Sequence, residues 1–118
     1  MIKKEYLEHL SKKRIESKKV TKVQEIYGAE FPEIVNKIIS NSNESIFFDD
    51  GCRMLSFDEI VDAENDLHVD FKEKGIIPLV DCGENDFVVY HFKDAIWSKF
   101  NIIDETVFKK KNCIDELL

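Results

Sequence analysis

The chain has 118 residues, which fits one domain and leaves no room for a second core. Hydrophobic residues make up 43% of the chain and aromatic residues 11%, enough apolar volume for a packed core, so disorder is not expected as the main state. The formal net charge of −7 opposes contact with phosphate backbones, and we expect no direct binding to nucleic acid.

The negative charge is concentrated in the middle of the chain. Residues 44–86 hold three Lys or Arg against thirteen Asp or Glu, whereas residues 1–37 hold nine against six. A face built from the middle segment would attract basic partners, and salt would weaken that attraction. The basic run Lys12-Lys13-Arg14, followed by Lys18, Lys19 and Lys22, is interpreted as a solvated helical surface, because charge runs of this length are common and need no partner.

The N-terminal residues and the cysteines bear on the compartment. Residues 1–22 are polar throughout, unlike a secretory leader, and no run approaches the roughly 18 apolar residues of a membrane span. We therefore expect a cytoplasmic protein with no membrane partner. Cys52, Cys82 and Cys113 are odd in number and about thirty residues apart. This pattern fits neither a disulfide framework nor paired metal knuckles, and we expect buried or idle thiols.

The first part of the chain predicts two amphipathic helices. Residues 16–27 place apolar side chains at helical spacing, and Gly28 can adopt the left-handed backbone that ends a helix. Pro32 suits the first turn of a second helix, which ends in the capping and turn residues 40–43. The buried positions expected on the two helices are Val20, Val23, Ile26 and Tyr27, and then Ile34, Val35, Ile38 and Ile39.

The middle of the chain predicts a hairpin and a third helix. Residues 46–48 and 53–55 form two short strands around the turn 49–52. Ser56 with Glu59 matches a capping box, which begins a helix from Phe57 to about Asn65. Residues 68–74 fit either a helical turn or a loop.

The last part of the chain is rich in strand signals. Residues 75–80, 87–92 and 95–97 are expected strands, and Pro78 suggests an edge position or a strand start because it lacks a donor N–H. Asp104 can cap a helix over residues 105–108, and Cys113, Leu117 and Leu118 form the apolar side of a C-terminal helical piece. Residues 1–118 are thus predicted to be one α+β domain, with helices flanking an antiparallel meander sheet.

Read in order, these motifs resemble the SUKH superfamily, which includes a fungal regulator of cell-wall assembly and many small bacterial proteins. The first block contains Tyr27-Gly28, Phe31-Pro32, Ile38-Ile39 and Ser42-Asn43. Later blocks are Met54-Leu55-Ser56 with Glu59-Ile60, then Ile76-Ile77-Pro78-Leu79, the turn with Asp81 and Asp86, and residues 88–90. The resemblance spans about residues 20–97 and depends on the order and spacing of the motifs.

The resemblance implies an immunity protein, which binds a toxin of its own cell or kin and blocks it. Such toxins are often nucleases, whose basic substrate groove an acidic domain can occupy. The candidate contacts with the partner are the turn acids Asp49, Asp50, Glu84 and Asp86, which can point outward without disturbing a core. Tyr90 and Trp97 are candidate aromatic anchors, although a lone Trp in a small domain is more often a core residue.

Catalysis and metal binding have weak signals. His9, His68 and His91 are far apart, and His91 is interpreted as a sheet-surface residue rather than a base. Two metal sites are conceivable, one of hard ligands and one of soft ligands, but neither has the spacing of a known site. We expect no enzyme activity, no cofactor and no metal. The hard-ligand set is Glu44, Asp49, Asp50 and Asp58, and the soft set is Cys52, Cys82 and His91.

Two other functions stay open at this level. The chain can be a non-catalytic regulatory scaffold that binds a housekeeping protein, by analogy with the fungal relative. It can also be an enzyme, which predicts a deep pocket holding a histidine or paired carboxylates with shifted pKa values. The sequence leaves the oligomeric state and the identity of the toxin open.

Overall fold

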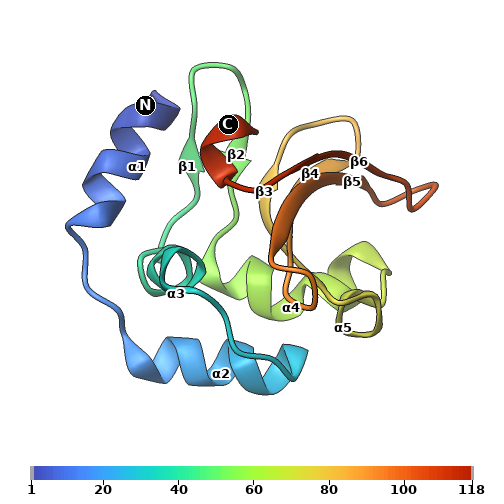
Figure 1. Cartoon of the computed structure of the whole chain (residues 1–118), viewed down its shortest axis with the longest axis horizontal. Helices are drawn as coiled ribbons and strands as arrows, with labels where there is room; N and C mark the ends of the chain where they lie inside the picture. The colour runs from blue at the N-terminus through green and yellow to red at the C-terminus, as the bar shows by residue number, and fades with distance from the viewer. Residues whose placement is uncertain (1, 118) are drawn as a thin grey trace.

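The computed structural model describes residues 2–117, which form one six-stranded sheet with helices around it (Figure 1). The helices are α1 (Lys3–Ser11), α2 (Ser17–Tyr27), α3 (Glu33–Ser40), α4 (Phe57–Leu67), α5 (Phe71–Lys74) and the short 3-10 helix η1 (Ile114–Glu116). The strands are β1 (Ile46–Phe47), β2 (Arg53–Met54), β3 (Ile76–Asp81), β4 (Asp86–His91), β5 (Ile96–Asn101) and β6 (Val107–Lys111).

The sheet is an antiparallel meander in which every strand pairs with its neighbours in the chain. The helices α4 and α5 form the connection between β2 and β3, so the chain leaves the sheet only once between its first and last strand. This arrangement confirms the predicted α+β fold. Within residues 2–117, no helix combines the length and apolar character needed to cross a bilayer.

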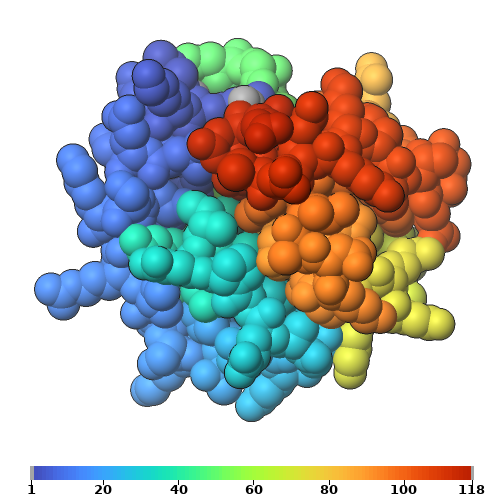
Figure 2. Space-filling model, viewed as in Figure 1, coloured from blue at the N-terminus to red at the C-terminus, as the bar shows by residue number. Residues whose placement is uncertain are grey.

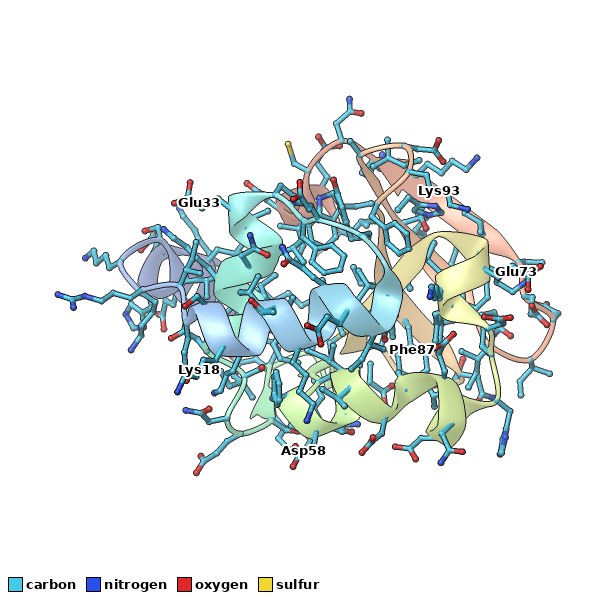
Figure 3. All side chains as sticks on the ribbon, turned by 90° about the horizontal axis from the view of Figure 1, so that it is seen from below. Lys18, Glu33, Asp58, Glu73, Phe87 and Lys93 are labelled. Carbon is cyan, nitrogen blue, oxygen red and sulfur yellow. The ribbon has the colours of Figure 1, made fainter. Side chains whose placement is uncertain are left out.

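The helices α2 and α3 end where the sequence predicts. Gly28 closes α2 with φ +65°, and its N–H donates to the carbonyl of Gln24 at 2.7 Å. Pro32 immediately precedes α3, which buries Val35 and Ile38 completely. One difference concerns the basic run: Lys12 to Arg14 lie in the exposed link between α1 and α2 rather than on a helix. Lys19 and Lys22 of α2 extend over the ring of Phe57, so α2 and α4 lie side by side (Figure 3).

Helices cover both faces of the central strands. Alternate residues of β4 point to opposite faces, yet all of residues 87–91 are buried. On one face, Phe71 of α5 meets Phe100 edge-on, with ring centroids 6.1 Å apart. On the other face, Ile34 of α3 and Ile114 lie around Trp97. The buried side chains from both faces belong to one hydrophobic cluster.

The expectation that Pro78 marks an edge strand is wrong, because β3 lies between β2 and β4. The reason is the shortness of β2, which pairs only with Val80 and Asp81. Pro78 lies in the half of β3 beyond that pairing, and the register to β4 shifts between Pro78 and Val80. An interior strand can thus hold a proline at a bulge beyond a short neighbour.

The expected helix over residues 105–108 is also wrong, since β6 begins at Val107. Asp104 does accept hydrogen bonds, but they come from the N–H and the hydroxyl of Thr106, at 3.1 and 2.7 Å, and they form a turn. The strand that follows carries Lys109, Lys110 and Lys111 on the outer edge of the sheet.

The C-terminal helical piece is shorter than expected. It consists of η1, whose Ile114 is buried together with Leu117, whereas Cys113 is exposed. Leu118 lies outside the described residues.

The hydroxyl of Tyr27 joins α2 to α4 and offers a test of the helical layer. It donates to the carbonyl of Ile60 at 2.8 Å inside the core. Replacing Tyr27 with Phe should lower the free energy of unfolding by about 1 kcal/mol, measured by urea denaturation. Tyr6→Phe is the matched control, because the Tyr6 hydroxyl bonds to none of residues 2–117 and borders a surface pocket. Equal losses in the two variants would contradict the role given to this hydrogen bond.

Candidate partner-binding surface

Three turns emerge from the same end of the sheet. Arg53 pairs with Asp81, and Asp86 pairs with Asn101, so the turns after β3 and β5 and the tip of the β1–β2 hairpin all lie at this end. Figure 2 shows the hairpin tip and the β3–β4 turn projecting at the same upper edge, on either side of the C-terminal segment. We call the acidic residues of these turns the acidic rim: Asp49, Asp50, Glu84, Asp86, Asp104 and Glu105.

The hairpin tip supplies two carboxylates. Asp50 accepts the N–H of Cys52 at 3.0 Å and forms an ion pair with Lys3 of α1. The hydrogen bond from Lys3 keeps the pKa of Asp50 below its usual value. Asp49 beside it is exposed. The tip is therefore held against α1 while it presents negative charge to solvent.

The β3–β4 turn supplies the other two predicted carboxylates. Glu84 is exposed and has φ +54°, a left-handed conformation that the tight turn requires. Asp86 is partly buried and accepts the side-chain amide of Asn101 at 2.8 Å. The structure thus brings all four predicted acids to one end of the sheet, where Asp49, Asp50 and Glu84 are exposed and Asp86 is partly buried.

Asp104 and Glu105 belong to the same rim and were missed. The prediction of a helix at residues 105–108 hid the turn in which they lie. The β-branched pair Thr106-Val107 was the available signal for a strand there. Glu105 forms an ion pair of 2.5 Å with Lys74 of α5, which places this turn against the helical layer.

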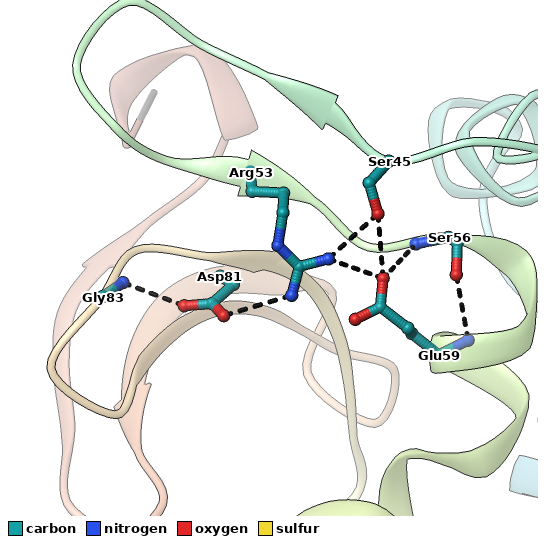
Figure 4. A network of polar contacts seen from close by, with 6 residues as sticks. All are labelled: Ser45, Arg53, Ser56, Glu59, Asp81 and Gly83. Carbon is teal, nitrogen blue, oxygen red and sulfur yellow. Dashed lines mark hydrogen bonds and ion pairs between the residues drawn. The ribbon is translucent and has the colours of Figure 1, made fainter.

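Arg53 connects the bases of two of these turns to α4 (Figure 4). Its guanidinium donates to Oε1 of Glu59 at 2.6 Å and to Oδ2 of Asp81 at 3.3 Å. The other carboxylate oxygen of Asp81 accepts the N–H of Gly83 at 2.9 Å, inside the β3–β4 turn. Arg53 also donates to the hydroxyl of Ser45 at 2.9 Å, just before β1. One side chain thereby positions the hairpin, the turn and the start of α4.

Glu59 has two roles in this network. It completes the predicted capping box, accepting the N–H of Ser56 at 3.0 Å while its own N–H donates to the Ser56 hydroxyl at 3.3 Å. Burial by itself would raise the pKa of Glu59, but hydrogen bonds from Arg53, Ser56 and Ser45 outweigh it and lower the pKa to about 2. The carboxylate is therefore ionised at neutral pH and holds Arg53 in place.

Tyr90 and Trp97 lie in the core rather than on the rim. They are 6% and 3% exposed, and their rings pack together with centroids 5.0 Å apart. A partner bound to the outside of this fold meets little of either ring. We therefore assign them a packing role and do not include them in the binding surface.

The interpretation of His91 as a sheet-surface residue is wrong. His91 is buried, and its Nε2 lies 2.6 Å from the hydroxyl oxygen of Ser98. Ser98 is fully buried as well. The pair satisfies two polar groups inside the sheet.

The conceivable metal sites do not assemble. Within residues 2–117, no three His, Cys, Asp or Glu side chains are grouped so that they could hold a metal ion. Cys52 and Cys82 are neighbours, since the register next to Arg53 and Asp81 sets them opposite each other. His91 is at the other end of β4.

One surface pocket of about 310 Å³ lies between α1 and the segment before β1. Its polar residues are largely used within the fold: Asn43 accepts a hydrogen bond from Lys19, and Asn41 donates to the carbonyl of Lys37 at 2.8 Å. His9 lines the pocket, but no carboxylate does. The pocket therefore holds one of the two groups that the enzyme hypothesis names, a histidine, and not the paired carboxylates.

Comparison with known proteins adds no relative: no family model, curated protein or solved structure matches the chain.

The Arg53 network predicts a measurable loss when its cation is removed. Arg53→Met leaves Glu59 and Asp81 close together without their shared donor, and should lower the free energy of unfolding by about 1–3 kcal/mol. Lys18→Met, an exposed change on α2, is the matched control and should stay within about 0.5 kcal/mol of the parent protein. Equal urea midpoints for the two variants would show that the network does not stabilise the fold.

The low pKa of Glu59 predicts how stability depends on acid. Its pKa is about 2 in the folded protein against 4.5 ordinarily, so the stabilisation is complete above pH 4.5 and is lost as the pH falls toward 2. Glu59→Gln should therefore be less stable at pH 7 and should lose less stability than the parent between pH 5 and 2.5. Parallel profiles in urea titrations would contradict this assignment.

His91 predicts a second pH effect with a different window. Burial lowers its pKa below the ordinary 6.5, so the unfolded chain takes up the proton first. Stability should be constant above that value and should decline as the pH falls below 6.5. His91→Gln should flatten the profile between pH 7 and 5, whereas His9→Gln, on the exposed side of α1, should leave it unchanged. Thermal unfolding across this range measures both.

Proposed function

We propose that the protein is an immunity-type protein of the cytoplasm that binds a cognate toxin with a basic surface and blocks its active cleft. The observation that carries the proposal is the acidic rim, in which three turns bring six carboxylate residues to one end of the sheet. The motif order that resembles the SUKH superfamily supports the same function. No cofactor takes part in this function.

The rim suits recognition because its turns are fixed before a partner arrives. Asp50 is tied to Lys3, Asp86 to Asn101 and Glu105 to Lys74. Side chains that are already ordered lose less conformational entropy on binding. Beneath them, Arg53 holds the bases of two turns against α4. The rim therefore presents a defined pattern of negative charge to a partner.

The basic groups near the rim are Lys3, Lys4, Arg53 and Lys74, against the six carboxylate residues of the rim. Lys3 and Arg53 have side chains that are 21% and 22% exposed, so both are mostly covered by the groups they bind. Asp49 and Glu84 are exposed beside them. A basic cleft meets the carboxylates first, which favours fast association that salt slows.

Neutralising the rim tests the proposal. Asp49→Asn with Glu84→Gln removes two exposed charges and should weaken binding to the toxin encoded beside this gene by about tenfold at low salt. The difference in affinity between the variant and the parent should shrink as salt rises, because screening weakens the attraction between the parent's rim and the basic partner. Titration calorimetry at two ionic strengths measures both effects.

The matched control removes two charges elsewhere. Glu25→Gln with Glu30→Gln changes exposed acids on and just after α2, at the opposite side of the fold from the rim (Figure 1). This variant should bind as the parent does. Equal weakening in both double variants would mean that net charge, rather than the rim, attracts the partner. Failure of the protein to protect cells that express the neighbouring gene product would overturn the immunity function itself.

A further inference from the structure

Two cysteines face each other beneath the acidic rim. Cys52 is the last residue of the hairpin turn before β2, and Cys82 is the first residue after β3. Because Arg53 pairs with Asp81 in an antiparallel register, the next pair outward is Cys52 with Cys82. Both are free thiols.

The backbone pattern places the pair at the position where side chains approach most closely. The N–H of Leu55 donates to the carbonyl of Leu79 at 3.0 Å, so these two residues form a hydrogen-bonded pair. Along an antiparallel ladder, hydrogen-bonded pairs alternate with non-hydrogen-bonded pairs. Counting outward from Leu55 and Leu79, Cys52 with Cys82 is a non-hydrogen-bonded pair. Accordingly, the carbonyl of Cys52 accepts from Phe48 and the N–H of Cys82 donates to Asp86, each away from the other cysteine. Opposite Cα atoms at such a pair lie about 4.5 Å apart, within the range that a disulfide spans.

We propose that Cys52 and Cys82 form a reversible intramolecular disulfide when the protein meets a peroxide. The thiolate of Cys82 attacks one peroxide oxygen, the O–O bond breaks, the other oxygen leaves as hydroxide, and the sulfur becomes a sulfenic acid. The thiolate of Cys52 then attacks the Cys82 sulfur, the S–S bond forms, and a second hydroxide leaves. The two protons from the thiols convert both hydroxides to water, so the thiols lose two electrons and the peroxide gains them.

The surroundings decide which sulfur reacts first and how fast. Cys82 is partly exposed, whereas Cys52 is 8% exposed, so a small oxidant reaches Cys82 first. Burial raises the pKa of the Cys82 thiol to about 12, and the contact with Cys52 adds to this, although Lys99 and Lys3 act in the opposite direction. The reduced pair is thus slow to react at neutral pH, and its oxidation accelerates with the thiolate fraction, about tenfold per pH unit.

The disulfide would join two turns of the rim at their bases. Asp50 and Asp49 precede Cys52, and Glu84 follows Cys82 by two residues. Arg53 and Asp81, the adjacent pair, already tie the same two segments together through the guanidinium. A covalent link next to this ion pair would fix the spacing of the turns without reorganising the sheet. The inference concerns the thiols themselves and holds whether or not the partner is a toxin.

The experiment uses the full chain with Cys113→Ser, which removes the exposed third thiol and leaves the facing pair. After treatment with hydrogen peroxide at pH 9, we expect both remaining thiols to be lost to maleimide labelling and a peptide linked through Cys52 and Cys82 to appear by mass spectrometry. Dithiothreitol should restore both thiols. The oxidised form should unfold at a temperature at least about 5 °C higher, because the link closes a long loop of the unfolded chain.

A second variant separates this reaction from general oxidation. Cys82→Ser with Cys113→Ser has no facing thiol, so it should show neither the link nor the temperature shift. The inference is overturned if the Cys113→Ser protein keeps both thiols at pH 9, or if they are lost only as separate sulfinic or sulfonic acids. A folded circular dichroism spectrum before treatment ensures that either result refers to the native pair.

Discussion

The guanidinium of Arg53 is the interaction on which the acidic end of the fold depends. β1 and β2 have two residues each, too few for backbone pairing to fix the hairpin by itself. Arg53 compensates by binding carboxylates from two other elements, Glu59 of α4 and Asp81 of β3. Because the Glu59 carboxylate also caps α4, the helix start and the hairpin are positioned by one network. The partly exposed setting lets these charges pair without the full desolvation penalty of a buried ion pair.

Much of the fold follows from local sequence signals. The left-handed Gly28, the capping box of Ser56 and the β-branched and aromatic run at residues 87–92 each encode an element by themselves, and the structure contains all of them. The failures occurred where distant contacts decide. Pro78 fits in an interior strand because the neighbouring β2 is short and does not pair with it. The residues around Pro78 carry no information about the length of β2. The sequence of helix α1 has few helical signals beyond Tyr6 and Leu10, which lie one helical turn apart. These two side chains are buried only because other parts of the fold pack against them.

The surface was harder to predict than the fold. Turn composition located Asp49, Asp50, Glu84 and Asp86, but their meeting at one end of the sheet required the strand register. Arg53 gave no signal, since a single basic residue in an acidic segment has no pattern. The aromatic residues Tyr90 and Trp97 were ambiguous because the same side chains serve cores and interfaces, and only burial separates the two roles. His91 shows the same limit, since its partner Ser98 lies on another strand.

The lysines on β6 protect the sheet edge from pairing with another copy of the chain. An open sheet has two outer strands whose unpaired backbone groups can recruit another chain and seed aggregation. At one side β1 is only two residues long, and at the other side β6 carries Lys109, Lys110 and Lys111 in succession. Two copies brought together along β6 would set like charges against each other. The lysines thus protect β6, the edge strand that is long enough to pair with another chain. The turns stay available for recognition.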